Sequence, residues 1–118
     1  MGLYSELPVY KASYDLLVII FDYSRGFTRE YKYTIGEKLK NETVEMITNI
    51  YRANCRKEKS ALIVQALENV EVIRLYMRLL KDLRQVSIRK FVEINEQIES
   101  ISRQLNGWNK YTERTSPK

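Results

Sequence analysis

Positively charged side chains repeat at helical spacing between residues 74 and 81. Arg74, Arg78 and Lys81 follow one another in steps of four and three residues, so they would share one strip along the surface of a helix. Arginine and lysine neutralise phosphate groups and release the counterions of a nucleic acid. The strip is therefore a candidate binding surface for a polyanion.

Further cations would join this strip at one end of the molecule if neighbouring helices run antiparallel. Tyr31 and Tyr33 lie among them, and tyrosine rings can stack on unpaired bases. The alternative is a solvated face whose charges confer solubility and pair within a helix. The candidate binding residues are Arg25, Arg29, Lys32, Arg74, Arg78, Lys81, Arg84, Arg89 and Lys90. A weaker, dispersed cluster at the opposite end comprises Arg52, Arg56, Lys57 and Lys59.

The residue types that enzymes use most are scarce. The sequence has no histidine and one cysteine, Cys55, so a histidine-based metal site and a cysteine–histidine pair are both impossible. We interpret Glu42 and Glu45 as solvent-facing helix surface rather than an acid–base pair. The sequence contains no glycine-rich phosphate loop. We predict a protein that is not an enzyme and that uses no catalytic residue, metal or cofactor.

Length and composition indicate one helical domain. The chain has 118 residues, two prolines, four glycines and a net charge of +5, which favours long helices and permits a polyanionic partner. A lone cysteine indicates a reducing compartment. The apolar run from Leu16 to Phe21 is too short to span a bilayer. We therefore expect a cytoplasmic protein without a membrane segment.

Local signals divide the chain into four helices. Pro8 suits the first turn of a helix because its missing N–H costs nothing there. Thr28, Ser60 and Ser87 are of the types that cap helix beginnings. The expected helices span residues 8–26, 28–54, 60–83 and 87–107.

Gly107 is expected to end the last helix. Residues 1–110 would then form the domain, and residues 111–118 a flexible C-terminal tail. Because the connections are short, successive helices must lie antiparallel. The predicted fold is an all-α, up-down-up-down antiparallel four-helix bundle.

The helix expected over residues 60–83 carries apolar residues on two faces. One stripe suits the core and comprises Leu62, Ala66, Ile73, Tyr76, Met77 and Leu80. The second stripe lies on nearly the opposite side and comprises Val64, Val72, Leu75 and Leu79. One four-helix core cannot cover both, so we predict that the second stripe is an oligomer interface. The alternative is a set of singly exposed apolar residues, which monomers tolerate.

Two other features concern packing. The run from Leu16 to Phe21 covers every direction around the first helix, so part of its surface needs a second partner. Gly36 interrupts the second helix at a cost of about 1 kcal/mol relative to alanine. It either permits a close helix crossing or marks a helix beginning that is displaced from Thr28.

Four segments resemble the accessory variability determinant (Avd) proteins of diversity-generating retroelements: "LPVYKASYDLL", "FTREYKYTIGEKLKNE", "RLLKDLRQVS" and "LNGWNK". The resemblance implies a four-helix-bundle subunit of a homopentameric barrel with a basic surface. It also implies binding to the element's reverse transcriptase and to RNA or DNA, as a non-catalytic cofactor of mutagenic cDNA synthesis from template-repeat RNA. Tyr33, Thr34, Gly36 and Trp108 are family-like positions for which we expect packing roles.

Two alternatives remain open. The chain also resembles the four-helix-bundle proteins encoded in intervening sequences of 23S ribosomal RNA genes. A protein-interaction scaffold without nucleic-acid function would instead bind through its apolar stripe. One bundle fold can serve all of these functions.

Overall fold

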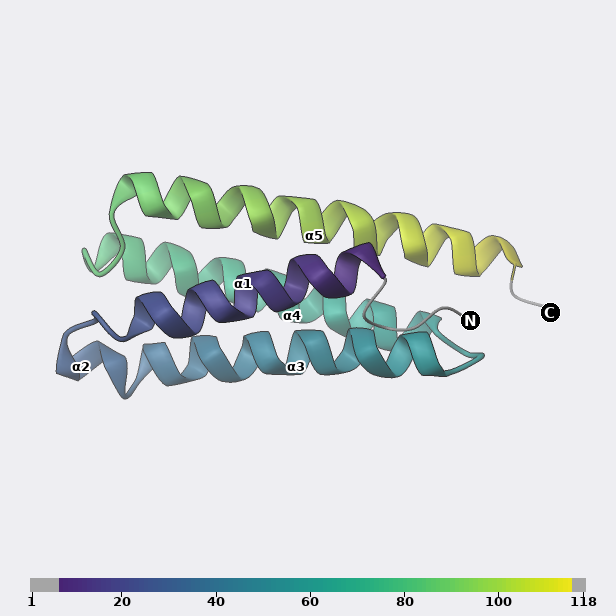
Figure 1. Cartoon of the computed structure of the whole chain (residues 1–118), viewed down its shortest axis with the longest axis horizontal. Helices are drawn as coiled ribbons and strands as arrows, with labels where there is room; N and C mark the ends of the chain where they lie inside the picture. Colours follow the sequence, from purple (N-terminus) through teal and green to yellow (C-terminus); the bar gives the residue numbers. More distant parts are fainter. Residues whose placement is uncertain (1–6, 116–118) are drawn as a thin grey trace.

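The computed structural model describes residues 7–115. They fold into four long helices and one single-turn helix, joined by short connections (Figure 1). The elements are α1 (Pro8–Ser24), α2 (Arg29–Lys32), α3 (Ile35–Cys55), α4 (Ser60–Asp82) and α5 (Ile88–Thr115). Within the described residues all regular structure is helical. The predicted all-α class is confirmed.

Successive long helices run antiparallel, as Figure 1 shows. Both α1 and α4 pack against α3 and α5, so α1 and α4 occupy diagonally opposite corners of the bundle. The connection from α1 through α2 to α3 lies at the same end as the connection from α4 to α5. This arrangement confirms the predicted up-down-up-down four-helix bundle.

The core is built from apolar residues that repeat every three or four positions. Fully burying such a side chain contributes about 1.5–3 kcal/mol to stability. The predicted core stripe of α4 is confirmed, because Ala66, Ile73, Met77 and Leu80 are buried and Leu62 and Tyr76 pack against the core. The other helices supply chiefly Leu16, Ile20, Leu39, Met46, Ile50, Ile94, Ile98, Ile101 and Leu105.

Most helix beginnings follow the local signals. Pro8 and Ser60 are the first residues of α1 and α4. Ser60 is not itself the cap, because Lys59 holds that position, and Thr28 precedes α2 without a side-chain capping bond. Ser87 caps α5, because its Oγ accepts a hydrogen bond from the Lys90 backbone N–H at 3.1 Å. This bond satisfies one of the N–H groups that a helix leaves without a partner in its first turn.

The expected helix end at Gly107 is wrong. α5 continues through Gly107 to Thr115, so the expected tail is helical from Tyr111 to Thr115, and residues 116–118 lie outside the described residues. Trp108 packs against the core in this extension. Its packing can offset the cost of a mid-helix glycine, which is about 1 kcal/mol.

The expected continuous helix over residues 28–54 is also wrong. The single turn of α2 ends at Lys32, and α3 begins at Ile35. Gly36 is buried directly after this break, and a Cβ atom there would lie 3.0 Å from the Tyr31 carbonyl oxygen and 3.3 Å from Cδ2 of Phe27. Gly36 therefore permits a close approach, but to the preceding turn rather than to a crossing helix. The interpretation as a displaced helix beginning is the better one.

Gly36→Val is expected to lower the free energy of unfolding by about 2 kcal/mol, because the added side chain must displace the Tyr31 carbonyl or the Phe27 ring. Gly107→Val is the matched control. A Cβ at Gly107 meets nothing within 4 Å, so no loss is expected. Thermal unfolding at one protein concentration measures both. Equal melting temperatures for the two variants would show that the turn before α3 is not packed on Gly36.

Candidate functional site

The connections α1–α2 and α4–α5 hold each other at one end of the bundle. The Thr28 backbone N–H donates a hydrogen bond to Gln85 Oε1 at 2.8 Å, and the Ser87 backbone N–H donates one to the Tyr23 hydroxyl oxygen at 3.5 Å. Phe27 and Val86, one from each connection, are buried. Two segments far apart in sequence thus form one fixed surface.

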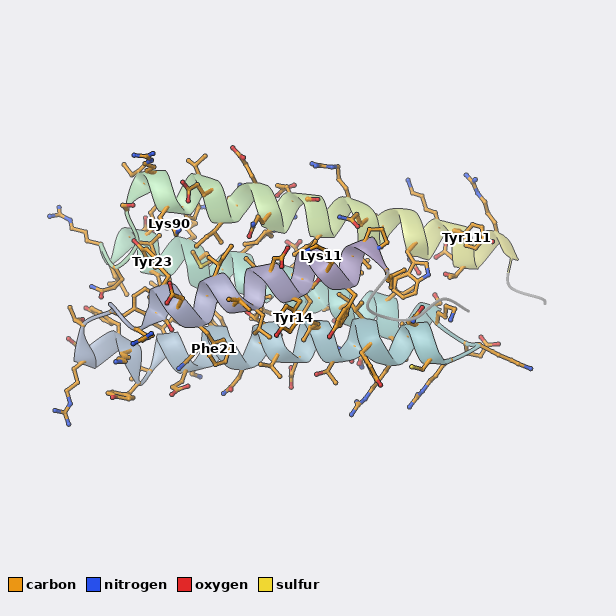
Figure 2. The ribbon with its side chains drawn as sticks, viewed as in Figure 1. Lys11, Tyr14, Phe21, Tyr23, Lys90 and Tyr111 are labelled. Atoms are coloured by element: carbon orange, nitrogen blue, oxygen red, sulfur yellow. The ribbon has the colours of Figure 1, made fainter. Side chains whose placement is uncertain are left out.

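Cations from both connections gather on this surface, which we call the basic end. It comprises Arg25, Arg29, Lys32, Arg84, Arg89 and Lys90. Lys90 lies over the Tyr23 ring, with 5.5 Å between its Nζ and the ring centroid (Figure 2). The structure therefore brings these six predicted binding residues together at one end, whereas Arg74, Arg78 and Lys81 lie along α4.

Only some cations of the basic end are paired. Arg25 lies 3.8 Å from Asp22, and Lys90 lies 3.4 Å from Glu93. The three exposed guanidinium groups of Arg29, Arg84 and Arg89 form no ion pair within residues 7–115. These three arginines can therefore bind anionic groups without breaking an existing pair.

The strip on α4 is more engaged than its spacing indicated. Arg74 pairs with Glu71 of its own helix, with 3.3 Å between Nε and the carboxylate, and also with Glu99 of α5. The three-residue spacing of Glu71 and Arg74 allows the first pair within one helix, but only the packing of α4 on α5 brings Glu99 to Arg74.

The other two cations of the strip differ from each other. Lys81 lies over the Phe91 ring at 4.9 Å from its centroid. Arg78 is exposed, and no ion pair involves it in the described part of the chain. Of the three cations in the strip, Arg78 is therefore the one that is exposed and without an ion pair among the described residues.

Arg84 has an unusual backbone conformation, with φ at 61°. The Arg84 N–H donates to the Lys81 carbonyl at 3.0 Å, and the Gln85 N–H donates to the Leu80 carbonyl at 2.9 Å. These bonds form a Schellman motif, in which glycine is the preferred left-handed residue. The sequence offered no signal for this feature, because no glycine follows α4. An arginine thus occupies a strained position within the basic end.

Arg84→Gly is expected to raise the free energy of unfolding by about 0.5–1 kcal/mol. A left-handed conformation costs a non-glycine residue about 1–2 kcal/mol, and the greater freedom of glycine in the unfolded chain offsets part of that relief. Chemical denaturation measures the change. Arg84→Ala is the control, because it removes the same charge and keeps the strain. A similar stability for both variants would contradict the strain assigned to Arg84.

The second stripe of α4 lies on the outward face. Leu75 is 62% exposed, Val64 and Leu79 are also exposed, and Val72 is half-buried. On the diagonally opposite helix α1, Tyr14, Val18 and Phe21 are exposed. They border a groove of about 520 Å³ between α1 and α3. The apolar excess predicted on these two helices therefore points away from the core.

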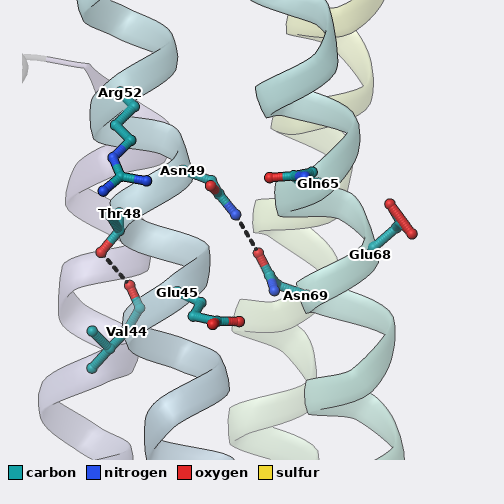
Figure 3. Close-up of a pocket in the computed structure, with 8 residues that line it drawn as sticks. All are labelled: Val44, Glu45, Thr48, Asn49, Arg52, Gln65, Glu68 and Asn69. Atoms are coloured by element: carbon teal, nitrogen blue, oxygen red, sulfur yellow. Dashed lines mark hydrogen bonds between the residues drawn. The ribbon is translucent and has the colours of Figure 1, made fainter.

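A polar groove lies between α3 and α4 (Figure 3). Asn49 donates a hydrogen bond to Asn69 Oδ1 at 2.8 Å, and Asn69 donates one to the Glu42 carboxylate at 2.7 Å. Glu42 is thus half-buried and bonded, which corrects its interpretation as solvent-facing surface, whereas Glu45 is exposed. Asn69 is buried and satisfied on both amide atoms, so this network fixes α3 against α4.

The dispersed basic cluster lies at the opposite end of the bundle. Lys59 is engaged there, because its ammonium group donates to the Ala53 carbonyl at 2.9 Å and thereby caps α3. Arg52, Arg56 and Lys57 are exposed. One cation of this cluster, Lys59, is therefore used to cap a helix and is less available for a ligand.

Among the described residues, no group of three or more potential metal ligands comes together. None of the helices described is both long and apolar enough to cross a bilayer.

Comparisons with known proteins give the family. A search of curated proteins found no match to the chain. The model of the bAvd-like family matches residues 9–112, which run from the first turn of α1 almost to the end of α5. The match therefore spans all four long helices and both connections that form the basic end. The chain belongs to the bAvd-like family.

Proposed function

We propose that this protein is a non-catalytic accessory subunit of a diversity-generating retroelement. It binds the element's reverse transcriptase and nucleic acid, and so supports mutagenic cDNA synthesis from template-repeat RNA. Membership of the bAvd-like family supports the accessory role. The nucleic-acid part of the proposal depends on one observation, which is the set of unpaired guanidinium groups on the basic end.

These groups suit phosphate for three reasons. The guanidinium fork matches a phosphate bidentately. Arg29 begins α2, Arg84 lies between α4 and α5, and Arg89 lies in the first turn of α5. A 2.8 Å hydrogen bond joins Thr28 to Gln85 in these same two segments, so the relative positions of the three arginines are constrained before binding. They are exposed and form no ion pair within residues 7–115, so a phosphate can reach them without breaking an existing pair.

The apolar surfaces support assembly of identical subunits. The exposed apolar residues of α1 and of α4 lie on diagonally opposite helices. Two different faces that contact each other make a heterologous interface, and such an interface forms a ring when the rotation between subunits closes. We propose a homopentamer in which Val64, Val72, Leu75 and Leu79 form one side of each interface.

The proposed function is tested by fluorescence anisotropy of a labelled structured RNA with the purified protein across a salt series. A steep fall of affinity with salt is expected, because each neutralised phosphate releases counterions. Absence of binding at low salt would overturn the nucleic-acid part of the proposal. Co-purification with the reverse transcriptase tests the other part. Capture of the polymerase without RNA binding would favour a protein-interaction scaffold.

A further inference from the structure

Tyr33 is an aromatic residue that the fold exposes without using it in the core. Its side chain is 61% exposed, so the packing role expected for it from the sequence is wrong. It stands at the break between α2 and α3, where its backbone leaves the helical conformation with φ −97° and ψ 6°. The packing of the bundle gives no reason for an exposed ring at this position.

The backbone around Tyr33 is nevertheless held in place. The Thr34 hydroxyl donates a hydrogen bond to the Glu30 carbonyl at 2.7 Å. The Tyr31 carbonyl lies against Gly36, so closely that a Cβ there would stand 3.0 Å from it. At the start of the same turn, Thr28 is bonded to Gln85 of the neighbouring connection. The ring therefore projects from an anchored turn, and little backbone entropy is lost when something binds to it.

Cations flank the ring. The Lys32 ammonium lies 5.8 Å from the Tyr33 ring centroid. Arg29 is the first residue of the single helical turn that ends just before Tyr33. Arg29 is exposed and is one of the unpaired arginines of the basic end. Although Lys32 lies over the ring, Tyr33 stays largely exposed, so an accessible aromatic ring stands beside groups that can hold phosphates.

We infer that Tyr33 is a stacking platform for an unpaired base, so that the basic end binds single-stranded nucleic acid in preference to duplex. An aromatic ring beside cations suits a single strand, because the bases can stack on the ring while the cations follow the phosphates. In a duplex the base faces are already stacked on one another and cannot reach the ring. This inference rests on the proposed nucleic-acid function and specifies the form of the ligand.

The test compares oligo-uridine, an abasic strand of equal length and a fully paired RNA duplex of equal length, each measured by anisotropy at several salt concentrations. Oligo-uridine is chosen because its bases stack little on one another. Tyr33→Ala is expected to weaken binding to oligo-uridine by about tenfold, as loss of one stacked base does. Binding to the abasic strand and to the duplex is expected to stay unchanged. The salt slope should also stay unchanged, because no phosphate contact is lost.

Two variants serve as controls. Tyr33→Phe keeps the ring and is expected to bind as the unmodified protein does. Tyr111→Ala removes a tyrosine of similar exposure, 65%, at the opposite end of the bundle (Figure 2), and should have no effect. Circular dichroism checks that each variant retains its helices.

The outcomes separate this inference from the proposed function. If the unmodified protein binds none of the three ligands at low salt, the nucleic-acid function itself fails. If it binds with a steep salt slope but Tyr33→Ala weakens all three ligands equally or none of them, only the stacking role is overturned. Tighter binding to the duplex than to oligo-uridine would also overturn it.

Discussion

Replacing Arg29, Arg84 and Arg89 together by glutamine is expected to lower the affinity for RNA by about 100-fold at about 0.1 M salt. Each phosphate contact to a single strand contributes about 0.7 to the slope of log affinity against log salt. Loss of three contacts should therefore lower the slope by about 2, which at about 0.1 M corresponds to roughly two decades of affinity. A salt series by anisotropy measures both quantities.

The matched control neutralises the same amount of charge at the other end of the bundle. Arg52, Arg56 and Lys57 are exposed there, and their joint replacement by glutamine changes the net charge equally. If the basic end is the binding surface, this control should keep most of the affinity. Equal losses in both triple variants would show that RNA responds to the overall charge and not to the geometry of the basic end.

Leu75→Glu is expected to dissociate the proposed oligomer and to leave the helices intact. Leu75 is 62% exposed in the single chain, so the substitution should cost the isolated bundle little. In an interface, the lost burial costs about 2 kcal/mol, and desolvating an unpaired carboxylate costs several kcal/mol more. A total of roughly 5 kcal/mol per contact lowers the association constant more than a thousandfold. Light scattering measures the mass, and circular dichroism the helix content.

Val92→Glu provides the comparison. Val92 is 48% exposed on α5 and lies outside the α4 stripe, so the same kind of change there should preserve the oligomer. A full-sized oligomer of Leu75→Glu would place the interface elsewhere, with the exposed residues of α1 as the next candidates. Dissociation by both variants would indicate a general effect of added negative charge.

The two predictions are connected through avidity. An oligomer presents several copies of the basic end to one nucleic acid, and linked sites bind far more tightly than a single site does. Leu75→Glu should therefore also weaken binding to a long RNA. Binding to a strand short enough for one basic end should be unaffected. Measuring the affinity of Leu75→Glu for a long and for a short RNA therefore separates the effect of oligomer assembly from the effect of direct contacts to the RNA.

The sequence alone predicted much of the fold because its signals are local. Pro8 and Ser87 mark helix beginnings through backbone chemistry that involves only a few neighbouring residues. Apolar spacing along α4 predicted which of its residues face the core, and short connections predicted the antiparallel order. The wrong expectations arose where tertiary packing outweighs a local signal. Trp108 packs on the core in a helix that continues through Gly107, and Gly36 packs against the turn before α3.

In the candidate site, too, local sequence predicted some features and tertiary packing decided others. Residue types and spacing determined which cations could bind a polyanion, and bundle topology determined that the two connections meet at one end. Which cations are free was decided only in three dimensions, because Glu99 of α5 neutralises Arg74 and is distant in sequence. The exposure of the Tyr33 ring is likewise a property of the folded chain, and no glycine in the sequence indicated the left-handed conformation of Arg84. Local sequence sets which helices form and which face is apolar, whereas pairing and exposure depend on neighbours that only folding brings together.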